Sequence, residues 1–312
     1  MENNFVLIIG VTASGKGRVA FELARQTGGE IISIDSMKVY KRMDIGTAKP
    51  PKEARQIVPY HLIDIIEPSE QFSAGLFLKS ANAAIEEIRK KGKPVIAVGG
   101  TALYIKALLY GLFEGPSADA KIRSELKTEA QTNGLKSLYE QLQKVDPDTA
   151  GRISSNDEKR IIRALEVFRI TGKPISAFQN QWDSEKNAGH NWIVLGLRRD
   201  KQEENKRMNA RVGKMIEAGL VDEVQSLLAE EKPLSMQARC AIGYAEIIDY
   251  INGKTSLDDA VELIKKNTRF LAKHQRTWFR SFKNVRWLDI ANEEPPEKIF
   301  AEAVNLIEGI NH

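Results

Sequence analysis

The sequence is poor in the residues that build disulfides, zinc sites and membrane spans. It has one cysteine, Cys240, in 312 residues, which excludes an internal disulfide and a zinc site made of several cysteines. We expect Cys240 to be a small buried thiol. No apolar run approaches the roughly 18 residues of a membrane span, and no basic residue precedes the short apolar run at the start. We therefore expect a cytoplasmic protein without membrane contact.

Histidine is also scarce, and the 46 Lys and Arg nearly balance the 42 Asp and Glu. There are four histidines, and the net charge is +4; His274 sits in no metal-ligand spacing, so no metal site built from protein ligands is expected. This mild charge does not by itself imply a nucleic-acid partner. The chain is 42% hydrophobic and 28% charged, which predicts one large or two modest globular domains.

Short β-rich apolar runs alternate with longer helical patterns along much of the chain. The runs are FVLII at 5–9, EIISI at 30–34, PVIAV at 94–98, WIVLGL at 192–197 and VRWLDI at 285–290. A helix is expected between Ser73 and Lys91, and strand signals vanish from about residue 115 to 189. The pattern predicts an α/β fold with a parallel sheet flanked by helices. We expect a core of residues 1–114 and 190–312 and an all-helical insertion domain of residues 115–189.

The stretch GVTASGKG at residues 10–17 has the spacing of a phosphate-binding loop, except that Gly17 replaces the usual serine or threonine. It lies between an expected strand and an expected helix, where the amides of residues 12–17 and the Lys16 ammonium would face one anion. The alternative is a glycine-rich turn without a ligand. Gly17 removes one direct Mg²⁺ ligand, although water can take that place.

Asp35 ends the second expected strand, at the sheet edge where the phosphate loop also lies. It can act as a base there, or it can cap the next segment through Ser36. A nucleotide hydrolase needs a further aspartate at the end of a later strand to hold magnesium. The run VIAVGGT instead ends at Thr101, and Asp64 lies inside its run. These residues favour diphosphate binding over ATP hydrolysis.

A basic segment lies near the end of the chain. Residues 263–287 carry eight Lys or Arg and no Asp or Glu, with aromatic residues interleaved. Arg269, Lys273, Arg276 and Arg280 fall near one helical face, which is typical of a track for RNA phosphates. The alternative is a solvated basic face whose aromatic residues pack in the core.

Several motifs together resemble the bacterial tRNA dimethylallyltransferases. They are GVTASGKG, DSMKVYKRMDIGTAKP, HLIDI, VGGTALYIKALL, RIIRALEVFRITGKPIS, GLVDEV, AIGYAEI and AKHQRTWFR. The resemblance implies a phosphate-loop NTPase-like fold that transfers a dimethylallyl group from dimethylallyl diphosphate to N6 of the adenosine at tRNA position 37. It also implies an insertion that grips the tRNA anticodon stem-loop. We further expect Mg²⁺ as cofactor and a monomer.

The resemblance further implies roles for individual residues. Asp35 is the general base, Lys16 and Arg211 are catalytic cations, and Thr101 lies at the reaction channel or caps the following helix. The diphosphate-binding residues are Gly10, Val11, Thr12, Ala13, Ser14, Gly15, Lys16, Gly17, Arg207 and Arg211, the two arginines not being separable. The tRNA-binding residues are Asp35, Ser36, Met37, Lys38, Thr101, Lys159, Arg160, Ile161, Ile162, Arg163, Arg239, Cys240, Lys273, His274, Gln275, Arg276 and Arg280, of which Ile161 and Ile162 are also candidates for inward packing.

Five positions depart from the family pattern. Gly17 replaces a hydroxyl residue, Val11 a proline, Lys38 a glutamine expected to read a base, Ala102 a glycine and His274 a basic residue. Two other functions stay open: a small-molecule kinase that uses ATP, and a tRNA-binding paralogue without catalysis. The kinase would bind ATP with magnesium, whereas the paralogue would bind tRNA and leave it unmodified.

Overall fold

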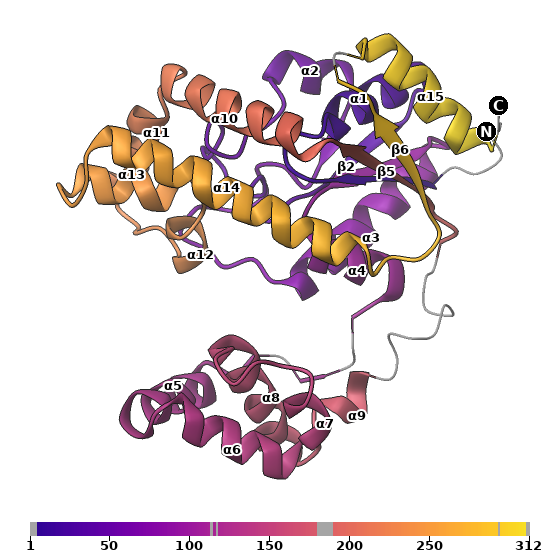
Figure 1. Cartoon of the computed structure of the whole chain (residues 1–312). Helices are drawn as coiled ribbons and strands as arrows, with labels where there is room; N and C mark the ends of the chain where they lie inside the picture. The colour runs from indigo at the N-terminus through magenta and orange to yellow at the C-terminus, as the bar shows by residue number, and fades with distance from the viewer. Residues whose placement is uncertain (1–4, 113–114, 117, 180–189, 293, 310–312) are drawn as a thin grey trace. The chain divides into compact units, whose positions relative to one another are not determined.

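The structure is a computed structural model that describes residues 5–112, 115–116, 118–179, 190–292 and 294–309. The chain divides into two compact units (Figure 1). The core unit comprises residues 1–109 and 189–312, and the insertion unit comprises residues 110–188. Among the described residues, no helix is long and apolar enough to cross a membrane.

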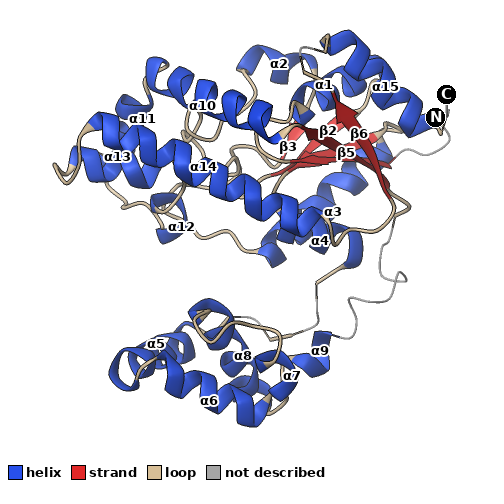
Figure 2. Ribbon diagram, in the orientation of Figure 1, coloured by secondary structure: helices blue, strands red, loops and turns tan. Residues whose placement is uncertain are grey.

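A six-stranded parallel sheet lies at the centre of the core unit, with helices on both of its faces (Figure 2). The strand order is β3-β2-β4-β1-β5-β6. The strands are β1 Phe5–Gly10, β2 Glu30–Ile34, β3 Tyr60–His61, β4 Val95–Gly99, β5 Ile193–Arg199 and β6 Val285–Ile290. The expected parallel α/β fold is thus confirmed. Only β3 was not expected, because two residues at the sheet edge are too few to show a hydrophobic period.

The helices of the core unit lie between its strands in the sequence, except the last, which follows β6. They are α1 Lys16–Thr27, α2 Lys52–Ile57, α3 Ala74–Lys90, α4 Ala102–Tyr110, α10 Lys201–Glu217, α11 Leu220–Leu228, α12 Met236–Arg239, α13 Tyr244–Ile251, α14 Leu257–Phe279 and α15 Pro296–Glu308. Helix α3 starts as expected, since the Ser73 side chain accepts a hydrogen bond from the Leu76 amide at its N-terminus.

Helix α1 is held against the sheet by a hydrophobic core, and this fixes the loop that precedes it. Its buried residues Val19, Leu23 and Ala24 pack with strand residues such as Ile8 and Ile96. Burial of whole aliphatic side chains contributes about 1.5–3 kcal/mol each. The phosphate loop is therefore anchored at one end by β1 and at the other by α1.

The insertion unit contains only helices among its described residues: α5 Ala120–Asn133, α6 Leu135–Val145, α7 Pro147–Ala150, α8 Glu158–Thr171 and α9 Ser176–Gln179. It has its own hydrophobic core, in which Leu126, Leu138, Leu142 and Leu165 are buried. Glu166, on α8, is fully buried inside this unit. Its carboxylate accepts hydrogen bonds from Arg123, Arg163 and the Asp119 amide.

Candidate active site

A cavity of about 1100 Å³ opens in the core unit beyond the carboxyl ends of the strands. It is lined by the loop after β1, by Asp35 after β2 and by Thr101 after β4, together with residues of α10 and α14. Open parallel sheets bind their ligands at this edge. The volume is slightly above the roughly 300–1,000 Å³ that is usual for small-molecule sites, so the cavity can hold more than one small ligand.

The lysine, arginine and acidic residues that line this cavity are almost all cationic. Six are lysine or arginine, and Asp35 is the one acidic residue among the described lining residues. The six are Lys16, Arg18, Lys38, Arg207, Arg211 and Lys214. Such a site favours a ligand that carries several negative charges, with one carboxylate beside it.

The phosphate loop has the backbone shape that its sequence predicts. Gly15 adopts a φ of 100° immediately before α1, a conformation that glycine adopts without strain. A Cβ at Gly10 would lie 2.7 Å from the Ser14 hydroxyl oxygen, so only glycine fits there. Ser14 is fully buried, and its hydroxyl has no hydrogen-bond partner in the part of the chain that the structure describes.

Fewer amides of the loop are open to an anion than the sequence suggested. The Thr12 amide donates to Oε1 of Gln275 at 2.9 Å, and the Ser14 amide donates to the Val11 carbonyl at 3.2 Å. The expectation that all amides of residues 12–17 face one anion is therefore wrong for these two. The amides at the start of α1 remain, where the helix dipole also favours an anion.

Lys16 is a partly buried cation among other cations. Its ammonium donates to the Val11 carbonyl at 3.0 Å. Burial, followed by the charges of Lys38 and Arg211, lowers the pKa of Lys16 to about 7, against the opposing influence of Asp35. A bound diphosphate would supply the missing negative charge and raise this pKa again.

Both candidate arginines of α10 reach the phosphate loop. Nε of the exposed Arg207 donates to the Ala13 carbonyl at 3.0 Å. Nη1 of the half-buried Arg211 donates to the Thr12 hydroxyl at 3.3 Å. Burial lowers the pKa of Arg211, with Asp35 opposing. The two arginines thus contact successive residues of one loop and lie in reach of the same ligand.

The carboxylate of Asp35 uses one of its two oxygens to cap the turn that follows β2. Its Oδ1 accepts hydrogen bonds from the amides of Met37 at 2.9 Å and Lys38 at 3.2 Å. The turn is therefore capped through these two amides and not through Ser36. Among the described residues no hydrogen bond reaches Oδ2, so the other oxygen is open to accept a proton.

Thr101 connects the ends of β4 and β2. Its hydroxyl oxygen accepts a hydrogen bond from the Ser36 amide at 3.2 Å. Its carbonyl, and not its side chain, accepts the first amide bonds of α4, from Tyr104 and Ile105. Side-chain capping of α4 was therefore wrong, and Thr101 holds the residue next to Asp35 while facing the cavity.

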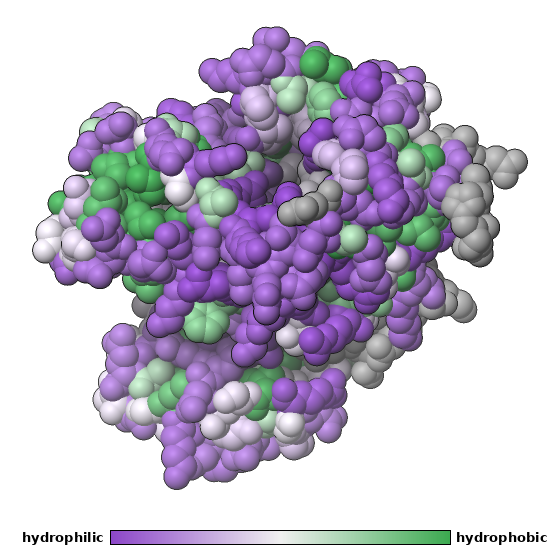
Figure 3. Space-filling model, turned by 45° about the horizontal axis from the view of Figure 1, so that its top comes forward, coloured by the Kyte–Doolittle hydropathy of each residue, from purple (hydrophilic) through white to green (hydrophobic). Residues whose placement is uncertain are grey.

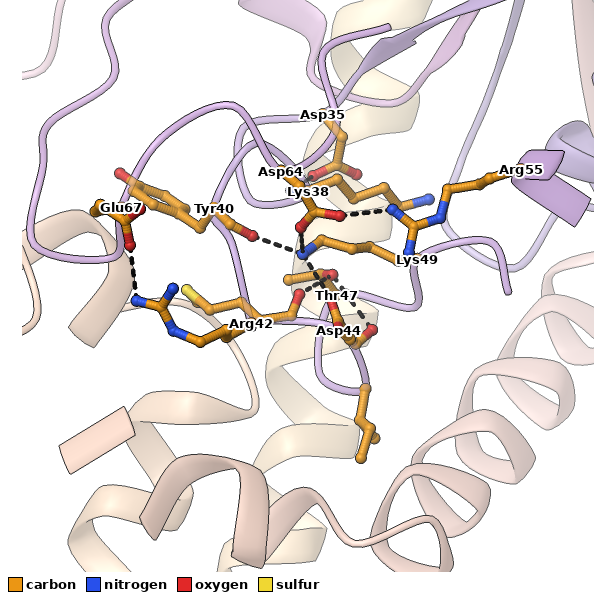
Figure 4. A network of polar contacts seen from close by, with 12 residues as sticks. Asp35, Lys38, Tyr40, Arg42, Asp44, Thr47, Lys49, Arg55, Asp64 and Glu67 are labelled. Carbon is orange, nitrogen blue, oxygen red and sulfur yellow. Dashed lines mark hydrogen bonds and ion pairs between the residues drawn. The ribbon is translucent and has the colours of Figure 1, made fainter. Parts of the chain in front are cut away.

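Lys49 holds the loop after Asp35 and was missed by the sequence reasoning. Its side chain is 2% exposed and its ammonium donates, each at 2.6 Å, to the Tyr40 carbonyl, Asp44 and Asp64 (Figure 4). Arg55 makes a second ion pair with Asp64, whose pKa is lowered because these hydrogen bonds outweigh its burial. Asp64 therefore has a structural role and is not a metal ligand of the cavity.

Glu223, on α11, holds the next part of the same loop. Its carboxylate accepts hydrogen bonds from the amides of Asp44, Ile45 and Gly46 and from the Tyr244 hydroxyl. A Cβ at Gly46 would lie 2.5 Å from the Tyr244 ring, so the close packing requires glycine. The motifs DIGTAKP, GLVDEV and AIGYAEI thus meet in one cluster, which was a signal that the sequence reasoning did not use.

Helix α14 supports the phosphate loop from its buried face. Gln275 is 8% exposed, and its amide group accepts from the Thr12 amide and donates to the Gly100 carbonyl, both at 2.9 Å. Both ends of this side chain are used inside the protein. Any effect of Gln275 on tRNA binding would therefore act through the loop that it positions.

The basic face of α14 is only partly open. Arg276 forms an ion pair with the buried Glu204, and Nη1 of Arg269 donates to the Asn209 side chain at 2.9 Å. Lys273, His274 and Arg280 are exposed. The expected four-residue phosphate track therefore has two members that are engaged inside the protein.

Aromatic residues of the same segment divide between core and surface. Phe279 and Phe282 are buried, as expected if the aromatic residues of this segment pack in the core. Phe270, in contrast, is 49% exposed. The molecular face in Figure 3 is mostly hydrophilic, with hydrophobic residues gathered in patches.

Cys240 is exposed and lines the cavity, so the expectation of a buried thiol was wrong. Arg239, beside it, is also exposed.

Residues 159–163 of α8 point in different directions. Ile161 and Ile162 are buried in the core of the insertion unit. Arg163 contacts Glu166 and the Pro116 carbonyl. Lys159 and Arg160 are exposed, and Arg160 has an ion pair with Asp157 at 3.2 Å. Of these five residues, Lys159 and Arg160 are the ones available to a ligand of this unit.

The described residues do not build a magnesium site of their own. They contain no group of three or more His, Cys, Asp or Glu that could hold a metal ion. At Gly17 nothing lies within 4 Å of the position that a Cβ would occupy, so no neighbour replaces the missing hydroxyl. A divalent ion fits this cavity only when diphosphate oxygens and water supply most of its ligands.

Known proteins with similar sequences and structures are transferases that act on tRNA. The family model described as IPP transferase matches residues 38–282, and that described as isopentenyl transferase matches residues 3–65. A tRNA dimethylallyltransferase 2 of Geotalea uraniireducens is 48% identical over 284 residues, 91% of each chain. The full-length tRNA isopentenylpyrophosphate transferase of Bacillus halodurans is 38% identical with a TM-score of 0.70, covering 98% of this chain and 97% of that one.

A more distant solved structure shares the fold. It is a eukaryotic dimethylallyltransferase acting on tRNA, 28% identical with a TM-score of 0.79. The match covers 98% of this chain and 80% of that one.

Proposed function

The chain belongs to the IPP transferase family and is a tRNA dimethylallyltransferase, and on that premise we propose how its cavity carries out the transfer. Dimethylallyl diphosphate is the donor, and the acceptor is N6 of the adenosine at position 37 in the tRNA anticodon stem-loop. The observation that carries this proposal is the cavity itself, where Asp35 stands alone among six cations next to a phosphate loop.

The transfer breaks the bond between the allylic carbon and the diphosphate oxygen, and it forms a bond between that carbon and N6. The diphosphate leaves with the electron pair of the broken bond. Lys16 and Arg211, together with the amides at the start of α1, are placed to stabilise its growing charge. Arg207 would assist from the solvent side of the loop.

The exocyclic amine must lose a proton as its new bond to carbon forms. The free oxygen of Asp35 accepts this proton, while its Oδ1 stays fixed by the Met37 and Lys38 amides. Thr101 holds the Ser36 amide and so keeps Asp35 in place at the end of β2. A fixed base loses little entropy on reaction, which is how positioning lowers a barrier.

Prenyl transfer from diphosphates typically depends on a divalent metal, and Mg²⁺ is the ion we propose here. It would enter with the diphosphate, whose oxygens and waters would bind it, and it would neutralise part of the diphosphate charge. The open space beside Gly17 leaves room for such a hydrated ion.

The insertion unit is proposed to contact the tRNA anticodon stem-loop through exposed basic residues such as Lys159 and Arg160. In the core unit Lys273, His274 and Arg280 are exposed candidates for phosphate contacts.

Mass spectrometry of tRNA nucleosides, after incubation with the protein and dimethylallyl diphosphate, tests the proposal. We expect an adenosine next to the anticodon to gain one dimethylallyl group. Unmodified tRNA that nevertheless binds the protein would indicate a paralogue without catalysis. Consumption of ATP with magnesium would indicate a kinase, which the lack of a second acidic residue among the described cavity residues argues against.

A further inference from the structure

Lys38 is a cation that the family resemblance does not explain. It stands where a glutamine is expected to read a base, and it lines the cavity together with Lys16 and Arg211. Its amide is bound to Oδ1 of Asp35 at 3.2 Å, which fixes where its side chain begins. Within the described part of the chain, no hydrogen bond or ion pair engages its ammonium.

The carboxylates around Lys38 are committed to other groups. Asp44 and Asp64 both pair with Lys49, and Asp64 also pairs with Arg55 (Figure 4). Asp35 already accepts two amides at Oδ1. Burial lowers the pKa of Lys38; Asp35 opposes this, and Arg211 and Lys49 add to it. A half-buried ammonium without a full counter-charge is costly unless a ligand brings one.

Gly17 removes a magnesium ligand, and a cation such as Lys38 could replace part of the charge that the magnesium ion supplies. The hydroxyl that normally helps to hold magnesium at the end of this loop is missing, and no described residue lies within 4 Å of the position that a Cβ would take at Gly17. The cavity therefore lacks one contribution to diphosphate binding and has gained a positive charge at Lys38.

We propose that the Lys38 ammonium binds the diphosphate of the donor beside Lys16, and that it replaces part of the metal contribution lost at Gly17. The inference rests on the proposed function for the identity of the anion. It predicts that the protein binds diphosphate well without a divalent metal, and that this metal-free affinity depends on Lys38. Base recognition then falls to other residues of the cavity.

Calorimetric titration with inorganic diphosphate tests the proposal, in the presence of a chelator and again with Mg²⁺. Lys38→Gln should weaken metal-free binding by about tenfold or more, the size of a charge-assisted hydrogen bond. The loss should be smaller with Mg²⁺, and Lys38→Arg should retain most of the affinity. Lys41→Gln is the matched control, because Lys41 lies in the same segment but pairs with Glu67 outside the cavity.

Thermal stability gives a second readout that a merely structural lysine would not show. Removing a half-buried charge that has no ion pair among the described residues should leave the ligand-free protein at least as stable as the wild type, whereas loss of a packing residue would lower its melting temperature. Equal metal-free diphosphate affinity in Lys38→Gln and wild type would overturn the proposal. Weaker tRNA binding in the variant, with diphosphate binding unchanged, would also overturn it and assign base reading to Lys38. Either result leaves the nucleoside assay of the wild type unaffected, so the two proposals fail separately.

Discussion

The cavity of the core unit and the interior of the insertion unit differ in how completely their charged side chains are paired. In the insertion unit, fully buried Glu166 accepts from two arginines and one backbone amide. Among the described residues of the cavity, Lys16 and Lys38 have no carboxylate partner of their own, and Asp35 is the one acid. Complete pairing serves the stability of a unit, whereas incomplete pairing of buried charges marks the place where a charged ligand completes the site.

The largest expected effect removes the single acid from the cavity. Asp35→Asn keeps an oxygen for the Met37 and Lys38 amides but cannot accept the proton, so turnover should fall by roughly 10²–10⁴-fold. Affinity for tRNA should change by no more than a few-fold. Single-turnover transfer and filter binding measure the two quantities. A variant that keeps more than about a third of wild-type turnover would remove Asp35 from the mechanism.

The next effect uses pH to test the unpaired charge of Lys16. Its pKa of about 7 lies below the ordinary 10.5, so Lys16 loses its proton in the free protein as pH rises above 7. Diphosphate binding needs the ammonium, and affinity should therefore fall by up to about tenfold per pH unit above 7. The measurement is calorimetry at pH 7 to 9, corrected for ionisation of the diphosphate itself. In Lys16→Arg, whose guanidinium stays charged, the decrease should be smaller than in the wild type, and the lowered pKa of Lys38 accounts for what remains. A flat wild-type profile would contradict the account.

A smaller effect weakens the pairing in the insertion unit. Glu166→Gln removes the negative charge that faces Arg123 and Arg163, and because both arginines are partly exposed the loss should be about 2 kcal/mol of that unit's stability. Hydrogen exchange should show faster opening of α5 and α8. Binding of inorganic diphosphate to the core should not change. Loss of diphosphate binding together with helix protection would show that the two units are not separate in function.

The smallest effect concerns the exposed basic residues of α14. Lys273→Gln should flatten the slope of log K for tRNA against log salt by about 0.7, since it removes one phosphate contact. Arg276→Gln should leave the slope unchanged, because Arg276 is paired with Glu204. Filter binding of the anticodon stem-loop across a salt series compares the two variants. Equal slopes in both variants would mean that Lys273 contacts no phosphate.

The sequence was most informative where a local pattern determines a local structure. Strands such as FVLII are apolar runs buried on both faces, and the phosphate loop is fixed by short-range backbone geometry at Gly10 and Gly15. Asp35 could be placed because the end of a parallel strand has a known location in the fold. These predictions depended on few long-range contacts.

The sequence was least informative about which partner each polar side chain chooses. Gln275 contacts Thr12 across 263 positions of the chain, and Arg276 turns from the basic face of α14 to Glu204. Glu223 clamps the loop at Asp44 from 179 positions away. Such pairings depend on the packing of whole helices, which residue spacing within one helix does not contain.

The central claim is that the cavity couples release of diphosphate to modification of tRNA. The most direct measurement follows released diphosphate and dimethylallyl adenosine in the same reaction, with dimethylallyl diphosphate as donor and, in parallel, ATP. The account predicts equal amounts of both products, formed only when tRNA and dimethylallyl diphosphate are present together. Phosphate released from ATP, or tRNA that binds without giving either product, would contradict it.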